Sequence, residues 1–153
     1  MKWSDYIDEK ELRKTIKILK PDSQLFEVRI IGERGKNNMA SGYFKDADTL
    51  ITAFDKMDLR RKNVYIVLNE INEACYSRKQ RDHFEATNVT TNDKDIASYE
   101  WLFIDLDPER TKEVSSTDEE LREAVKLAGK VKKYLEGMGF ERPVEALSGN
   151  GAH

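Results

Sequence analysis

Residues 26–30 are Phe-Glu-Val-Arg-Ile, and this alternation of apolar with charged side chains is the clearest guide to the fold class. A period of two places the three apolar side chains on one face of an extended chain, which predicts a half-buried β-strand. A turn-rich stretch at 32–38 separates it from a second short strand at 41–44. We therefore expect these two strands to form a hairpin with a long loop.

Helical periodicity appears on both sides of this predicted hairpin. Apolar residues recur at helical spacing over residues 8–19, and Pro21 ends that helix. Residues 47–54 predict a second amphipathic helix, with Asp46 as its N-cap. The β-branched and aromatic run at 64–68 predicts a buried strand.

The last third of the chain predicts a strand–helix–strand unit. We expect strands at 101–107 and 144–147, with a helix between them that a capping box at 116–119 opens and Gly137 closes. Its apolar stripe consists of Leu121, Ala124, Val125, Ala128, Val131 and Leu135. Helices and strands are mixed rather than strictly alternating, so we predict an α+β fold with one mixed β-sheet flanked by helices.

Composition narrows the class of protein. A chain of 153 residues is enough for a single domain, 1–153, with a real core. No apolar run approaches the roughly 20 residues of a membrane-spanning helix, so we expect no membrane partner. One cysteine, Cys75, cannot form an internal disulfide, which fits a reducing compartment and predicts a cytoplasmic location.

The net charge of −3 counts against nucleic-acid binding over the whole surface. An enzyme that grips a template in one cleft needs only a local basic patch, and two candidates exist, at 56–62 and at 78–81. Taken alone, each patch is more typical of a solvated charged face than of a nucleic-acid site.

Two acids end the predicted strand at 101–107, which is Trp-Leu-Phe-Ile-Asp-Leu-Asp. Residues two apart on a strand project from the same face, so Asp105 and Asp107 should point the same way. Neighbouring carboxylates repel one another, and a hard cation with oxygen ligands, Mg²⁺ or Mn²⁺, relieves that repulsion. Alternatively, the acids merely end a strand before Pro108 and pair with basic residues just beyond it.

A second candidate site is the stretch Ser-Gly-Asn-Gly-Ala-His at 148–153. Gly149 and Gly151 would let the backbone approach a phosphate closely, and Ser148 and His153 can donate hydrogen bonds to it. A short Gly-rich stretch after a strand is also typical of an ordinary turn. In a strand–helix–strand unit, however, this stretch and the two acids lie at the same end of the sheet and can share one site.

These two stretches resemble the motifs of a known family. Phe103–Asp107 resembles the first catalytic motif of the archaeo-eukaryotic primase superfamily, and residues 148–153 are similar to its second, Ser-x-His-type motif. Residues 90–96 and 107–110 are similar to the corresponding parts of phage and plasmid members. The resemblance is detailed from residue 90 onward and elsewhere covers only the order of elements.

The resemblance implies an RRM-like primase-polymerase catalytic core that performs template-dependent nucleotidyl transfer in phage- or plasmid-type DNA replication. The enzyme would be a DNA primase or polymerase, acting on nucleoside triphosphates and a DNA template or primer, with a helicase domain or subunit as a further partner. Asp105 and Asp107 would be the catalytic residues and would bind two Mg²⁺ or Mn²⁺ ions. The residues that would bind the nucleotide are Ser148, Gly149, Gly151 and His153.

One departure from the family pattern affects the expected activity. Members use a third metal-binding carboxylate on a later strand, and this sequence stops at His153 before any such strand. We therefore expect an N-terminal portion of the catalytic domain that is inactive by itself. Two alternatives stay open: a metal-dependent phosphohydrolase using the same acids, which fits Pro108 poorly, and a non-catalytic nucleic-acid-binding accessory domain of replication.

Overall fold

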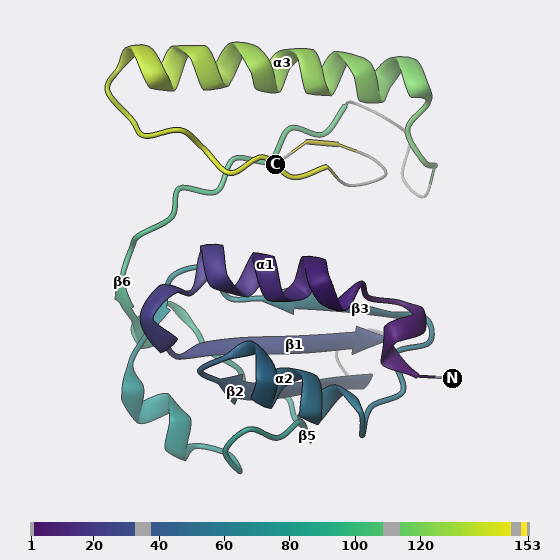
Figure 1. Cartoon of the computed structure of the whole chain (residues 1–153), viewed down its shortest axis with the longest axis vertical. Coiled ribbons are helices and arrows are strands. Elements are labelled where there is room, and N and C mark those ends of the chain that lie inside the picture. The colour runs from purple at the N-terminus through teal and green to yellow at the C-terminus, as the bar shows by residue number, and fades with distance from the viewer. Residues whose placement is uncertain (1, 33–37, 109–113, 148–150, 153) are drawn as a thin grey trace. The chain divides into compact units, whose positions relative to one another are not determined.

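The computed structural model describes residues 2–32, 38–108, 114–147 and 151–152. Over these residues the protein has an α+β fold that divides into two compact units, Met1–Trp101 and Leu102–His153. The N-terminal unit holds the main β-sheet and two α-helices, and the C-terminal unit is built on one long helix (Figure 1).

The N-terminal sheet has four strands in the order β3-β1-β2-β5, and each neighbouring pair is antiparallel. The strands are β1 Phe26–Gly32, β2 Met39–Phe44, β3 Lys62–Ile66 and β5 Glu85–Ala86. The predicted hairpin is confirmed as the pair β1–β2. The prediction of a mixed sheet was wrong, because each neighbouring pair of strands in this sheet is antiparallel. Strands β2 and β3 run parallel to each other, but β1 lies between them.

Two helices, α1 (Glu9–Leu19) and α2 (Ala47–Phe54), lie on the same side of β1 (Figure 1). Both begin at the predicted places: the Asp8 carboxylate accepts a hydrogen bond from the Glu11 amide at 3.0 Å, and the Asp46 carboxylate accepts one from the Thr49 amide at 2.8 Å. Such caps satisfy amide groups that have no partner within the helix. The core beneath the helices consists of Trp3, Ile16, Phe26, Val28, Ile30, Phe44, Leu50, Ala53, Phe54 and Leu59.

Strand β3 lies at an edge of the sheet rather than in its interior. The sequence predicted a buried strand at 64–68, but the side chains of Val64 and Tyr65 are 37% and 50% exposed. β-Branched and aromatic residues favour strands wherever one face is covered, so their presence does not separate an edge strand from a central one. The prediction was therefore right about the strand and wrong about its burial.

The other face of β1 carries a buried polar cluster centred on Glu27, whose side chain is fully buried. One carboxylate oxygen accepts a hydrogen bond from the Ser41 hydroxyl at 2.7 Å. The other accepts from the Thr91 amide at 3.0 Å and from Nε of Arg29 at 2.9 Å. The Lys79 ammonium lies 3.9 Å from the same carboxylate, and burial lowers the pKa of Lys79. These contacts attach the segment that follows β3 to the second face of the sheet.

That segment, for which the sequence pattern was weak, contains short elements only. Strands β4 (Glu70–Ile71) and β6 (Ile96–Ser98) form an antiparallel pair, and 3₁₀ helices occupy Glu73–Ser77 and Asp93–Asp95. Runs this short carry too few residues for periodicity to reveal them.

A second buried cation fixes the end of the N-terminal unit. The Lys20 ammonium donates hydrogen bonds to the carbonyl oxygens of Leu68 and Asn69, at 2.5 and 3.1 Å. Burial lowers the pKa of Lys20 to about 8. The Asn69 side chain in turn accepts hydrogen bonds from the amides of Glu100 and Trp101, both at 2.9 Å. The chain therefore leaves this unit from a defined position.

We predict that Glu27→Ala lowers the free energy of unfolding by about 3–5 kcal/mol, because it removes one partner of a buried ion pair and leaves buried cations without their anion. Glu9→Ala is a matched control: Glu9 pairs with Arg13 at 2.9 Å on the surface, and its loss should cost at most about 1 kcal/mol. Urea unfolding followed by circular dichroism measures both. Similar losses in the two variants would contradict a central role for Glu27.

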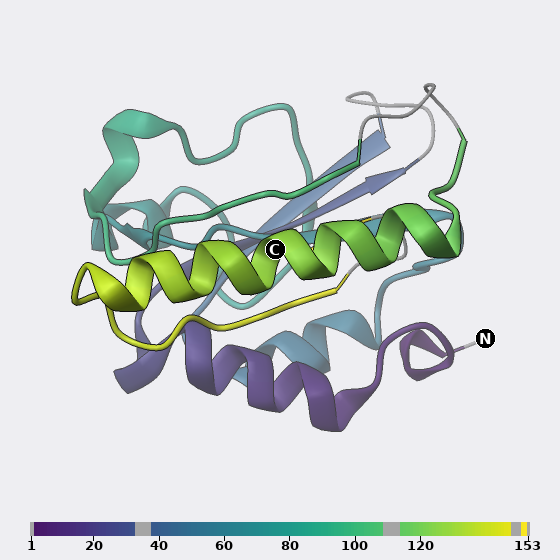
Figure 2. The same cartoon turned by 90° about the horizontal axis from the view of Figure 1, so that it is seen from above.

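In the C-terminal unit, α3 spans Asp118–Gly137. Its capping box is formed by Thr117 and Glu120, one residue later than predicted, since the same pattern occurs at both positions. Ala124 is buried and most of the predicted stripe is half-buried, but Val125 is 42% exposed and departs from it. The chain after α3 runs back alongside the helix in both views (Figures 1 and 2), where Lys132 and Glu145 form an ion pair.

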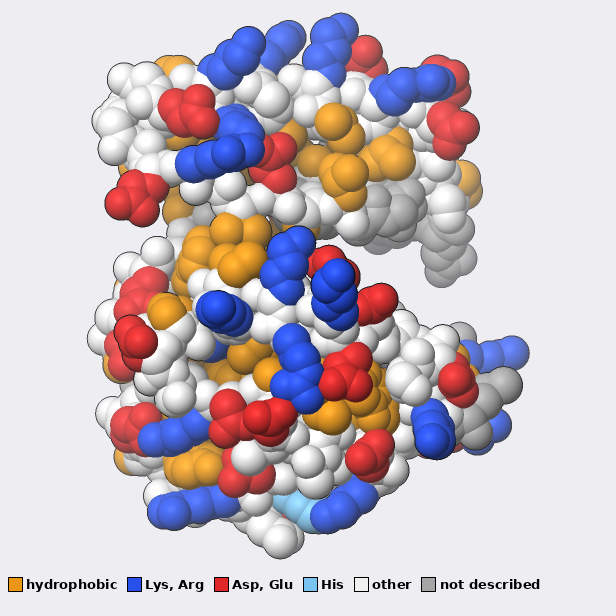
Figure 3. Space-filling view, in the orientation of Figure 1, with side chains coloured by type: hydrophobic (Ala, Val, Ile, Leu, Met, Phe, Trp, Pro, Cys, Tyr) orange, Lys and Arg blue, Asp and Glu red, His pale blue; other side chains and the backbone are white. Residues whose placement is uncertain are grey.

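The strands predicted at 101–107 and 144–147 are not formed. Within the described residues, these stretches make isolated bridges, Leu106 with Ala152 and Leu147 with Ala152. A strand needs a ladder of hydrogen bonds to a neighbour, and one bridge supplies too few. Hydrophobic side chains consequently stay at the surface of this unit, as Figure 3 shows; they include Leu102, Phe103, Val144 and Leu147, which are 46–68% exposed.

Candidate metal and nucleotide site

The acidic stretch keeps the alternation expected of an extended chain, although it is not a strand. Phe103, Asp105 and Asp107 are exposed, whereas Ile104 and Leu106 between them are half-buried. Both carboxylates therefore belong to the exposed set, where solvent and ions can reach them. This agrees with the expected alternation even though the expected ladder is missing.

The stretch around Gly151 lies directly against the acidic stretch. The Leu106 amide donates a hydrogen bond to the Ala152 carbonyl at 2.9 Å, and the Ala152 amide donates one back to the Leu106 carbonyl at 3.3 Å. Gly151 is buried, and a Cβ atom placed on it would lie 2.2 Å from Oδ1 of Asp107 and 2.9 Å from the Leu106 carbonyl oxygen. The Asp107 carboxylate thus packs against backbone that only glycine leaves uncovered.

The structure brings together Asp107 and Gly151 from the two predicted motifs. The other three predicted nucleotide-binding residues, Ser148, Gly149 and His153, lie outside the described residues. Among the residues that are described, no three His, Cys, Asp or Glu side chains gather into a metal-binding group. Asp105 and Asp107 supply the oxygen ligands that Mg²⁺ and Mn²⁺ prefer, so their chemistry fits these ions while their number is incomplete.

The stretch at 90–96, which resembles the lead-in of the family, has a structural role in the N-terminal unit. The Asn92 side chain accepts a hydrogen bond from the Lys94 amide at 3.1 Å, and the Asp95 carboxylate accepts one from the Asn92 amide at 3.0 Å. Arg78 donates two further bonds to Asp95, at 2.7 and 2.5 Å. These bonds hold the pKa of Asp95 at about 2, the Arg78 side chain being the largest cause.

This low pKa predicts an acid-sensitive contribution to stability. An unfolded aspartate has a pKa of about 3.9, so below that pH the unfolded chain binds a proton that the folded chain does not. The contribution of Asp95 is present above about pH 4 and is lost as the pH falls through about 2. Asp95→Asn should therefore flatten the decline in unfolding free energy over this range, as measured by urea unfolding at several pH values.

Asp93→Asn is the control, since it removes an exposed carboxylate from the same 3₁₀ helix and should retain the parental decline. Asp95→Asn should reduce the decline in unfolding free energy without abolishing it, because Arg60 also holds the pKa of Asp58 at about 2. An unchanged acid profile in Asp95→Asn would contradict the assignment.

The packing at Gly151 yields a second prediction. Gly151→Ala should cost about 1–3 kcal/mol, since its methyl group overlaps both a backbone oxygen and the Asp107 carboxylate. Hydrogen exchange of the Leu106 and Ala152 amides should accelerate as their paired hydrogen bonds open. Gly129→Ala is the control: nothing lies within 4 Å of its Cβ position in α3, so alanine should stabilise the helix by about 0.5–1 kcal/mol. Exchange that is equally slow in Gly151→Ala would contradict this packing.

The two basic patches have different surroundings in the structure. At 78–81, Arg78 is bound to Asp95, the Lys79 side chain is only 6% exposed beside Glu27, and Arg81 lies 4.9 Å from the centre of the Tyr76 ring. Most of this patch therefore stabilises the N-terminal unit. The patch at 56–62 adjoins an open pocket that includes Tyr6, a residue that no sequence motif indicated.

Comparison of the chain with protein-family models, with curated proteins and with solved structures found no match. None of the helices in the described part of the chain is long and apolar enough to cross a membrane.

Proposed function

We propose that this chain carries the catalytic motifs of a cytoplasmic primase-polymerase with an RRM-like core, which joins nucleotides on a DNA template in phage- or plasmid-type replication. The observation that carries the proposal is the contact between the Asp107 carboxylate and Gly151, with the paired hydrogen bonds of Leu106 and Ala152 beside it. Such an enzyme needs its metal-binding acids next to its phosphate-binding backbone, and these residues come from motifs far apart in sequence.

The chemistry of these residues suits phosphoryl transfer. Asp105 and Asp107 would hold Mg²⁺ or Mn²⁺, which neutralises phosphate charge and activates the attacking hydroxyl when bound. Gly151 has no side chain, so its backbone lies directly against Asp107, and the stretch proposed to bind phosphate is next to a residue proposed to bind metal. Ser148, Gly149 and His153 would add hydrogen-bond donors to the same triphosphate.

The level of activity depends on the remaining ligand. The resemblance requires a third carboxylate, and two-metal transfer loses most of its rate when the charges are incompletely held. Among the described residues no third carboxylate joins Asp105 and Asp107, so we expect this chain to bind metal weakly and to extend a primer slowly or not at all. Nucleoside triphosphates, a primed DNA template and a helicase domain or subunit would be the partners of the complete enzyme.

Metal binding is the first test. Mn²⁺ titration by calorimetry should detect a weak site that Asp107→Asn abolishes, because the substitution removes an anionic oxygen ligand. Glu141→Gln, which removes an exposed carboxylate after α3, should leave the site intact. Unchanged Mn²⁺ binding in Asp107→Asn would mean that the acid pair is structural, and would favour the accessory-domain alternative.

Product analysis separates the two enzyme classes. On a primed template with Mn²⁺ and nucleoside triphosphates, we expect at most slow primer extension with release of pyrophosphate, and Asp105→Asn should remove any such products. Release of inorganic phosphate without primer extension would instead support the phosphohydrolase alternative.

A further inference from the structure

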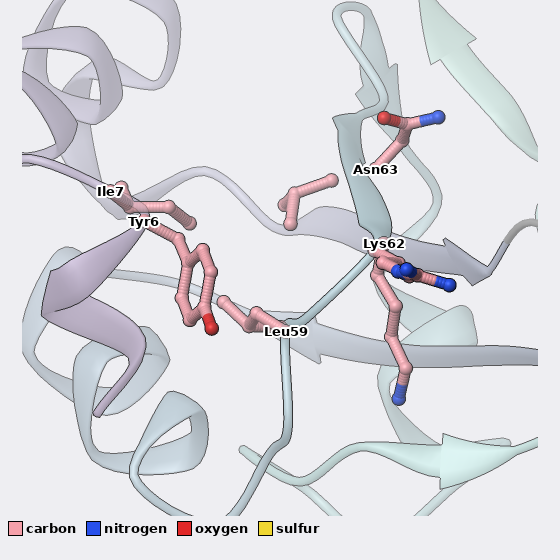
Figure 4. Close-up of a pocket in the computed structure, with 7 residues that line it drawn as sticks. Tyr6, Ile7, Leu59, Lys62 and Asn63 are labelled. Carbon is pink, nitrogen blue, oxygen red and sulfur yellow. The ribbon is translucent and has the colours of Figure 1, made fainter. Parts of the chain in front are cut away.

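An open pocket of about 520 Å³ lies in the N-terminal unit, between the first residues of the chain and the start of β3. Figure 4 shows the Tyr6 ring beside Leu59, with Lys62 and Asn63 across from them. Ile7, Arg61 and Val64 complete the lining. The Tyr6 side chain is 45% exposed, so a ligand could reach one side of the ring.

The pocket combines the groups that bind single-stranded nucleic acid. Such sites pair a cationic groove for phosphates with aromatic or apolar surfaces for bases. Tyr6 and Leu59 offer the base-contacting surface, and Arg61 and Lys62 supply the cations. The nearby Asp58 is already bound by Arg60 through bonds of 2.6–3.0 Å, so its negative charge is largely compensated.

The backbone at Arg61 gives a second, independent observation. Arg61 has a φ of 52°, in the left-handed region that glycine adopts at little cost and arginine at a larger one. It lies in a tight turn closed by a hydrogen bond from the Lys62 amide to the Leu59 carbonyl at 3.2 Å. Asp22, Ser23 and Asp82 share this conformation, and of these four described residues Arg61 is the one that lines the pocket. Strain of this kind is found at functional sites as well as in turns.

We propose that this pocket binds one nucleotide of a single-stranded nucleic acid, with the base on Tyr6 and Leu59 and the neighbouring phosphates on Lys62 and Arg61. The inference rests on the proposed function, because a polymerase must hold its template strand away from the reacting atoms as well as at them. Because the net charge of the chain is −3, we expect nucleic acid to bind at this pocket and not over the whole surface. The phosphate contacts make this binding sensitive to salt.

The test uses the full chain and fluorescein-labelled oligothymidine, with fluorescence anisotropy recorded in EDTA so that metal at the acid pair plays no part. Lys62→Gln should lower the slope of log affinity against log salt concentration by about 0.7, the value for one phosphate contact on a single strand. Tyr6→Ala should weaken binding about tenfold, as expected for the loss of one stacked base.

Matched controls come from the same unit. Lys94→Gln removes an exposed lysine, and Tyr99→Ala removes a tyrosine that is 76% exposed; neither residue lines the pocket, and both variants should bind like the parent. Arg61→Gly removes the cation and keeps the turn, because glycine suits a φ of 52°. Affinity for the oligonucleotide should fall, and the melting temperature recorded alongside shows whether the fold is kept.

The inference is overturned if Tyr6→Ala, Lys62→Gln and Arg61→Gly all bind oligothymidine like the parent, or if the two controls lose as much affinity. Binding to phosphatidylserine vesicles in place of oligothymidine would also overturn it and assign the pocket to an anionic lipid surface. Asp107→Asn keeps the two proposals distinguishable. If oligonucleotide binding depends on the pocket while Mn²⁺ binding does not depend on Asp107, the proposed catalytic site fails and the pocket stands, and the reverse result has the reverse meaning.

Discussion

The carboxylate of Glu27 imposes a constraint on most of the N-terminal unit, because a charge buried this deeply must be compensated and fully hydrogen-bonded. Its partners come from β1 itself, from β2 and from the segment after β3. Satisfying one side chain therefore brings these elements together. The helices cover one face of the sheet through apolar packing. The polar cluster and a second hydrophobic cluster of Leu25, Tyr43, Ile71 and Cys75 join the other elements.

The C-terminal unit depends on a different and smaller contact. Two backbone hydrogen bonds join Leu106 to Ala152, and the absence of a side chain at Gly151 lets the Asp107 carboxylate pack beside them. The contact joins a residue proposed to bind metal to the stretch proposed to bind phosphate, which is why it supports the proposed nucleotidyl transfer.

The lysine and arginine residues of the two basic patches have different roles because their surroundings differ. Arg78 and Lys79 are committed to Asp95 and Glu27 within the N-terminal unit. Arg61 and Lys62 line an open pocket near Tyr6. A basic run in the sequence contains the charge in either case, but the tertiary structure decides which of these residues pack inside the unit and which line a pocket.

Local sequence determined the elements whose causes are local. The cap at Asp46, the helical stripes and the alternation at 26–30 predicted α1, α2 and the hairpin, since each depends on neighbours only a few residues away. For the candidate site, the sequence indicated which residue types could bind metal and phosphate, and that the two motifs should meet.

Tertiary structure decided everything that depends on distant partners. The alternation at 26–30 predicted one covered face, yet both faces of β1 are buried, because Ser41 and Thr91 satisfy a glutamate that would otherwise need water. The position of β3 at an edge, the antiparallel order of the sheet and the isolated bridges at Leu106 and Leu147 follow from which segments pair. Periodicity records which side chains share a face, but pairing is settled by contacts between segments far apart in the chain.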